Sequence, residues 1–125
     1  MCHKYDIFKC GVNMDGIIFG HYDDNDMLKP FLQMSSADNV NAETRSLFGS
    51  VAPVYQVIFN NLEQPGFTDK KLTAKSKNAY GSMSAESAGG AVVTYNLTFF
   101  NKYLKFSGID LDMTSNENIT AKKIR

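Results

Sequence analysis

Tryptophan is absent from this chain of 125 residues, and cysteine, histidine and proline are scarce, with two, two and three copies. Two cysteines, Cys2 and Cys10, are too few for the disulfide framework of a small secreted domain, so we expect reduced thiols. The two histidines, His3 and His21, leave few nitrogen ligands for a transition metal. We therefore predict no metal site and no cofactor.

Net charge is also absent, since 13 Lys and Arg residues balance 13 Asp and Glu residues. No long basic run is present that could follow a phosphate backbone, so we do not expect a nucleic-acid partner. A chain near zero net charge repels its own copies weakly, which is compatible with self-association.

Long apolar runs are missing as well. No segment approaches the length of a membrane-spanning helix, and no secretory signal follows Met1. These features predict a cytoplasmic protein without membrane insertion. The length predicts a single domain over residues 1–125 that buries a core of its own.

The longest regular pattern in the chain covers residues 91–113. Apolar and polar side chains alternate over 93–99 and again over 104–113, which is the period of a half-buried strand. Asn101-Lys102 stands between the two alternations as a turn. The pattern therefore predicts a long β-hairpin that needs a partner layer.

Shorter patterns predict the remaining strands. Residues 54–59 are apolar on both faces, which predicts a central strand covered on both sides. Asp15-Gly16 favours a tight turn between strands at 5–12 and 17–22. Further strands are predicted at 27–34, 70–76 and 119–124, and residues 82–87 are either a strand or an ordered loop.

One short helix is predicted near residues 41–49, because Asn39 or Asn41 can cap its start and Gly49 can end it. With one helix among many strands, the predicted fold class is all-β and mainly antiparallel. Barrel and sandwich both remain open.

The sequence contains little that indicates catalysis. The chain has no Gly-x-Ser-x-Gly motif, and Gly89-Gly90 is expected to be a turn because no Lys-Ser or Lys-Thr follows it. Asp110 and Asp112 would point together into solvent from one strand. The acidic loop 21–26 lacks the central glycine and the distal glutamate of a calcium loop. We predict that the protein is not an enzyme and has no catalytic residues.

The last part of the chain resembles a known family. Ala88-Gly89-Gly90 with the following residues 92–99, then residues 101–111, then residues 116–124, are similar to the haemolysin-coregulated protein of type VI secretion and to phage tail-tube proteins. The resemblance covers roughly residues 88–124. It implies a β-barrel that forms hexameric rings, stacked as a tube inside a contractile sheath. It also implies spike and sheath proteins as partners, and export through the apparatus without a signal peptide.

The expected function is therefore structural: a self-assembling subunit of a ring or tube in a contractile injection apparatus. Four residues are predicted to supply a subunit interface, namely Tyr103, Phe106, Tyr55 and Val57. Two other functions remain open. One is a monomeric β-sandwich whose aromatic residues bind a carbohydrate or small ligand. The other is a small capsid or decoration protein.

Overall fold

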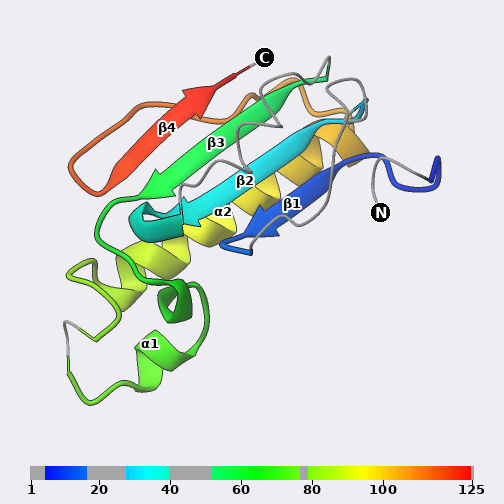
Figure 1. Cartoon of the computed structure of the whole chain (residues 1–125). Coiled ribbons are helices and arrows are strands. Elements are labelled where there is room, and N and C mark those ends of the chain that lie inside the picture. The colour runs from blue at the N-terminus through cyan, green and yellow to red at the C-terminus, as the bar shows by residue number, and fades with distance from the viewer. Residues whose placement is uncertain (1–4, 17–27, 40–51, 77–78, 125) are drawn as a thin grey trace.

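A four-stranded mixed sheet with a long helix along one face forms the centre of the molecule (Figure 1). The computed structural model describes residues 5–16, 28–39, 52–76 and 79–124. The strands are β1 (Gly11–Met14), β2 (Phe31–Ser36), β3 (Val54–Phe59) and β4 (Ile119–Lys123). In the described residues the helices are α1 (Lys70–Thr73) and α2 (Ala85–Leu104), together with the 3-10 helices η1 (Ala37–Asn39) and η3 (Gln64–Phe67).

The strands follow one another across the sheet in chain order. β1 pairs with β2 in parallel, β2 pairs with β3 in parallel, and β3 pairs with β4 antiparallel. Among the described strands, β1 and β4 are the two edges and do not pair with each other. The prediction of a mainly antiparallel all-β barrel or sandwich is therefore wrong, because the sheet is open, mostly parallel in its pairing, and covered by a helix.

The predicted hairpin over 91–113 is wrong, because residues 85–104 form α2. Ser84 begins the helix, and its Oγ accepts a hydrogen bond from the backbone N–H of Ser87 at 3.1 Å. Side chains that face the sheet recur every three or four residues along this segment, which is the helical period: Ala88, Val92, Tyr95, Phe99 and Tyr103. The segment satisfies a period of two over 93–99 as well, and burial against the sheet selects the helix.

Neighbouring predictions also differ from the structure. Gly89 and Gly90 lie inside α2 rather than in a turn, and the possible strand at 82–87 does not form, because residues 82–84 precede α2 and residues 85–87 are its first residues. The strand predicted at 70–76 is wrong, because residues 70–73 form α1. Each glycine costs about 1 kcal/mol in a helix interior, and the packing of a 20-residue helix on a sheet outweighs that cost.

Other predictions agree with the structure. β3 has the predicted bounds 54–59 and is buried at five of its six residues. β4 occupies most of the predicted 119–124 strand. The strand predicted at 27–34 begins later, at Phe31. The strand predicted at 5–12 is wrong for residues 5–10, because β1 covers only Gly11–Met14. The predicted strand at 17–22 and the helix near 41–49 lie outside the described residues.

The hydrophobic core lies between the sheet and α2. Leu32 and Met34 of β2 and Tyr55, Val57 and Phe59 of β3 face the helix and are fully buried. The Tyr55 and Phe99 rings meet edge to face with centroids 6.0 Å apart, which is a preferred geometry for an aromatic pair. This contact anchors the middle of α2 on the central strands.

The opposite face of the sheet carries a polar row. Asn13, Gln33, Gln56 and Lys122 lie in register across all four strands. Asn13 Nδ2 donates to Gln33 Oε1 at 3.0 Å, and Gln33 and Gln56 are buried. The two faces of the sheet are therefore chemically different.

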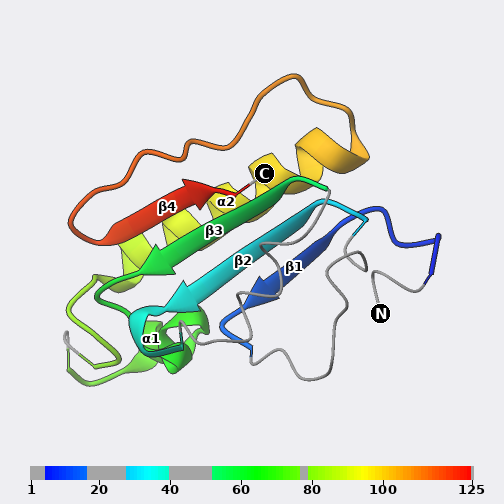
Figure 2. The same cartoon turned by 45° about the horizontal axis from the view of Figure 1, so that its top comes forward.

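The segment that links α2 to β4 passes along the outer edge of β4 (Figure 2). Ser115 Oγ accepts from the N–H of Ala121 at 3.0 Å, so this segment occupies part of the edge of the sheet. A strand edge that is bonded in this way is less available for pairing with another chain.

Candidate interaction surface on helix α2

The face of α2 that points away from the core carries four exposed apolar side chains, Val93, Leu97, Phe100 and Leu104. Their spacing of four, three and four residues places them in one line along the helix, as in a coiled-coil seam. Leu97 is 58% exposed. We call these four residues the α2 ridge. The ridge does not pack on the sheet, because the core contacts of α2 come from other positions.

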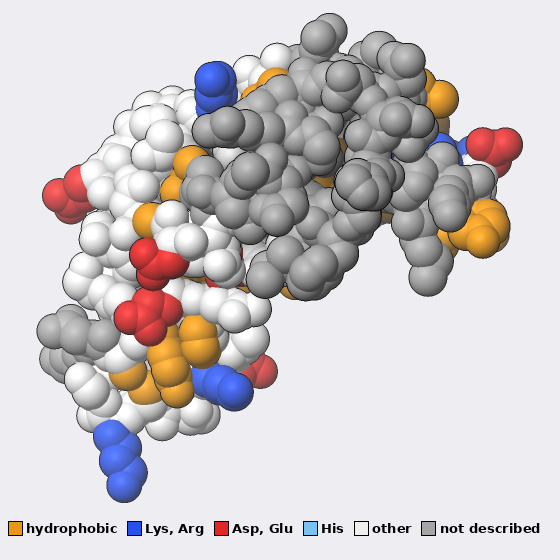
Figure 3. All heavy atoms as spheres, viewed as in Figure 1, with side chains coloured by type: hydrophobic (Ala, Val, Ile, Leu, Met, Phe, Trp, Pro, Cys, Tyr) orange, Lys and Arg blue, Asp and Glu red, His pale blue; other side chains and the backbone are white. Residues whose placement is uncertain are grey.

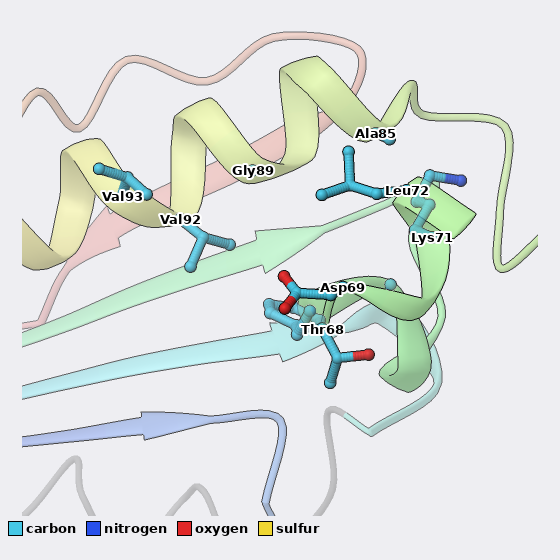
Figure 4. Close-up of a pocket in the computed structure, with 10 residues that line it drawn as sticks. Thr68, Asp69, Lys71, Leu72, Ala85, Gly89, Val92 and Val93 are labelled. Carbon is cyan, nitrogen blue, oxygen red and sulfur yellow. The ribbon is translucent and has the colours of Figure 1, made fainter. Parts of the chain in front are cut away.

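A cleft of about 160 Å³ lies beside the N-terminal half of α2, between that helix, η3 and α1 (Figure 4). We call it the α1–α2 cleft. Leu72 reaches from α1 toward the first turns of α2, and Thr68 and Asp69 lie on the η3 and α1 side. The apolar lining comes from six residues: Phe67, Leu72, Ala85, Gly89, Val92 and Val93.

Two features of the α1–α2 cleft affect what it can bind. A Cβ built at Gly89 would meet no atom within 4 Å, so the space beside this residue is open. Lys71 also lines the cleft, but its Nζ donates to the carbonyls of Ala79 and Gly81 at 2.7 and 2.8 Å. This ammonium is satisfied by the protein itself and is therefore a poor ligand for an anion.

The cleft and the ridge meet at Val93, which belongs to both. Leu72, which is 66% exposed, extends the apolar surface onto α1. Figure 3 shows hydrophobic side chains gathered at the surface over α1, with charged side chains around them. An apolar surface of this kind with a charged rim is typical of a site that binds another protein.

A polar cluster at the other end of α2 connects three elements. Tyr55 of β3 donates its hydroxyl proton to Asp110 Oδ1 at 3.0 Å, and the Tyr55 and Tyr103 hydroxyls lie 2.7 Å apart. Because Tyr55 has one proton to give, Tyr103 must be the donor in the second bond. Lys102 of α2 and Lys123 of β4 approach Asp110 at 3.1 and 3.5 Å.

The charges of this cluster explain its pKa shifts. Burial raises the pKa of Tyr55, and its hydrogen bonds with Tyr103 and Asp110 raise it further. Desolvation alone would raise the pKa of Asp110, but the bonds from Lys102, from the Leu111 N–H and from Tyr55, with the charge of Lys123, lower it to about 2. Tyr55 therefore stays protonated as a donor and Asp110 stays charged, which suits a fixed tie between elements rather than proton transfer.

A second buried polar group lies where β1 and β2 end. Asp15, at a φ of 55°, accepts at Oδ1 from the N–H of Ser36 at 2.6 Å, and the Ser36 hydroxyl is 3.0 Å from both carboxylate oxygens. The sequence predicted a turn here but not this contact, since Ser36 is 21 residues away. Carboxyl ends of parallel strands are a common place for ligands, but these groups already bind each other.

The four predicted interface residues lie in different surroundings. Tyr55 and Val57 are fully buried against α2, so contacts within the chain account for both. Tyr103 is partly buried beside Phe99, with ring centroids 5.0 Å apart. Phe106 is 89% exposed. The interface at Phe106 stays a prediction, and the structure brings Tyr55 and Tyr103 together through their hydroxyls.

Sequence reasoning missed the ridge, although a signal for it exists. Val93, Leu97, Phe100 and Leu104 fit a 4-3-4 spacing that a helical reading of this segment would have found. The cleft had no such signal, because its walls come from segments about 20 residues apart that only the fold joins.

The described residues form neither a metal-binding cluster nor a membrane-spanning helix. Within residues 5–16, 28–39, 52–76 and 79–124, no three His, Cys, Asp or Glu side chains are placed so that they could hold a metal ion. Cys2, His3 and His21 lie outside these ranges. No helix in the described part of the chain has both the length and the apolar character to cross a bilayer.

Comparisons with known proteins do not assign a class to this chain, so its class follows from its own geometry. No protein-family model matches the chain, and no curated protein is significantly similar to it. What the described residues define is an α/β fold with an open mixed sheet and an exposed apolar surface on its long helix.

Proposed function

We propose that this protein is a structural, self-assembling subunit whose copies associate through the α2 ridge. The observation that carries the proposal is the line of Val93, Leu97, Phe100 and Leu104, which are exposed at coiled-coil spacing on a helix of 20 residues. Burying such side chains between copies removes apolar surface from water, at roughly 25 cal/mol per Å². The zero net charge supports the same proposal.

The size of the α1–α2 cleft favours assembly over the competing function of a small-ligand module. Pockets for small molecules usually measure roughly 300–1,000 Å³. The cleft, at about 160 Å³, is closer to the size of one side chain. A carbohydrate-binding module is therefore the weaker proposal.

A more specific form of the proposal is a ring or tube subunit of a contractile injection apparatus, with spike and sheath proteins as partners. It rests on the resemblance over residues 88–124 alone. The closed barrel that the resemblance implied is not part of it, since the sheet is open. A capsid or decoration protein would assemble by the same physical means.

The test is the mass of the protein in solution by light scattering over a concentration series, with negative-stain imaging of the same sample. We expect a species of two or more chains. Leu97→Glu should convert it to monomer, because a charge in the ridge cannot be buried without a partner. Leu28→Glu is the matched control, since Leu28 is similarly exposed, at 63%, but lies outside the ridge.

The outcomes separate the candidates. A wild-type monomer at the highest concentration would contradict self-assembly and make a ligand screen the next step. Ring-shaped particles near six chains would support the tube form, and closed shells would support a capsid protein.

A further inference from the structure

The geometry points to a symmetric dimer in which α2 packs antiparallel against α2 of a second copy, with Phe106 of each copy in the α1–α2 cleft of the other. This inference rests on the proposed self-assembly and names its partner and packing. A two-fold axis near Leu97 would place the same surface on both sides, so every contact occurs twice. Dimers of this kind, rather than single chains, would then be the unit of any larger assembly.

The Phe106 side chain is exposed to solvent. It is 89% exposed at a φ of 56°, directly after the end of α2. The Ser107 N–H donates to the carbonyl of Asn101, six residues earlier, at 3.0 Å, so the chain folds back over the end of α2 through Phe106. A residue in this left-handed conformation just after the C-cap of a helix is normally glycine, because an L side chain is strained there. Among the described residues, no packing contact accounts for a large aromatic ring at this position, and the ring is mostly exposed.

The α1–α2 cleft matches a phenyl ring in size and chemistry. Its volume is about 160 Å³ and its walls include Leu72, Val92 and Val93. An apolar cavity of roughly 150 Å³ is known to hold benzene in a protein interior. Gly89 is one of the residues that line the cleft, and a Cβ added there would meet no atom within 4 Å, so a larger side chain at this position has room at the cleft.

The positions of Phe106 and of the α1–α2 cleft along α2 agree with antiparallel packing. Gly90 stands seven residues before Leu97 and Leu104 stands seven residues after it, each about 10 Å away at the helical rise. Rotation about an axis at Leu97 therefore sets Leu104 opposite Gly90 of the second copy, a large residue against a small one. Phe106 lies just beyond Leu104 and reaches the neighbourhood of Gly89.

Charge also favours this orientation. Glu86 is in the first turn of α2, and Asp69 lies at the rim of the cleft. Lys105 directly precedes Phe106 and is exposed. In the antiparallel arrangement Lys105 of one copy approaches the two carboxylates of the other, and the two helix dipoles run in opposite directions. A parallel arrangement would set like charges side by side.

The exposed apolar side chains would form the central part of such a dimer interface. A standard interface takes on the order of 800 Å² from each partner. The ridge, Leu72 and Phe106 together provide six large apolar side chains that are 37–89% exposed. They lie along a helix of 20 residues, which is a contact length typical of helix pairs.

The experiment tests the contact from both sides and by complementation. Gly89→Leu fills the cleft, and Phe106→Gly removes the ring while relieving the strain at a positive φ, so the second variant should fold at least as well as the wild type. Sedimentation equilibrium should show a dimer dissociation constant raised at least about tenfold for each variant alone. Mixed one to one, the two variants should form a heterodimer, because one open cleft and one phenylalanine remain to meet.

Matched controls exist in the segment after α2. Gly108→Leu adds the same side chain at a glycine whose Cβ would also meet nothing within 4 Å, and Ile109→Gly removes an apolar side chain that is 71% exposed. Both controls should dimerise like the wild type. If Gly89→Leu and Phe106→Gly also dimerise like the wild type, or if their mixture stays monomeric, the packing is overturned. In that case a monomeric Leu97→Glu would still support assembly through the ridge, whereas a monomeric wild type would overturn both proposals.

Discussion

Asp110 is the residue at which α2, β3 and β4 are tied together. Its carboxylate accepts from Tyr55 and lies within 3.5 Å of the Lys102 and Lys123 ammonium groups. The sequence predicted Asp110 as an exposed strand residue and could not predict its partners, which lie 8, 13 and 55 positions away. Partner choice at this distance depends on how elements pack, and local patterns do not encode that.

Asp110→Asn should lower the free energy of unfolding at pH 7 by about 0.5–1 kcal/mol, a small value because the carboxylate is half exposed and screened. The pKa of Asp110 in the folded protein, about 2, is below the ordinary value of roughly 3.9 for an unfolded chain. Its contribution is therefore full above about pH 4 and is lost as the pH falls toward 2.

Urea unfolding at pH 7 and at pH 2 measures this effect for the wild type and for Asp110→Asn. The two proteins should differ at pH 7 and converge at pH 2. Glu117→Gln is the control, since Glu117 is an exposed carboxylate outside the cluster. If Asp110→Asn is as stable as the wild type at pH 7, the cluster does not stabilise the fold.

Helix α2 is the element on which both the core and the proposed interface depend. One side contributes Ala88 and Phe99 to the core, and the other side presents the ridge. Its two glycines weaken its intrinsic preference for helix. The N-cap at Ser84 and the packing on the sheet must therefore offset that weakness.

Ser84→Ala should destabilise the protein by about 1 kcal/mol, because the Ser87 N–H loses its acceptor at the start of α2. Thermal unfolding followed by circular dichroism measures the change. Ser82→Ala, an exposed serine two residues earlier, is the control and should unfold like the wild type. Equal losses in both variants would mean that the cap at Ser84 has no special role.

At the scale of the whole molecule, an open sheet with a helix on one face leaves the outer side of that helix uncovered. The ridge lies there, together with the cleft formed by α1 and η3. Association through this surface links the stability of the fold to protein concentration, since a partner that binds the folded state stabilises it.

We expect the midpoint of thermal unfolding to rise by several degrees between low and high micromolar protein for the wild type. Leu97→Glu should show no dependence on concentration, because its monomers do not associate. Differential scanning calorimetry at three or more concentrations makes the comparison. A wild-type midpoint that stays constant would argue against association of the folded chain.

Local sequence was sufficient for the strands whose side chains are apolar or alternate without competition. β3 could be predicted with its bounds and its burial, because five of its six residues are β-branched or aromatic and therefore favour a strand. β4 follows for a similar reason at the end of the chain. The positive φ of Asp15 is also local, since Asp beside glycine tolerates it, whereas the second strand of the predicted hairpin lies outside the described residues.

Tertiary packing alone decided the rest. The sequence of residues 93–99 is compatible with both a strand and a helix. The helix is selected because its packing on the sheet buries Phe99, while the opposite side of the helix remains exposed. The parallel order of β1, β2 and β3 pairs residues about 20 positions apart, which no local period can encode. The ridge and the cleft are surfaces left over once the core has formed, so they exist only after the long-range contacts have been made.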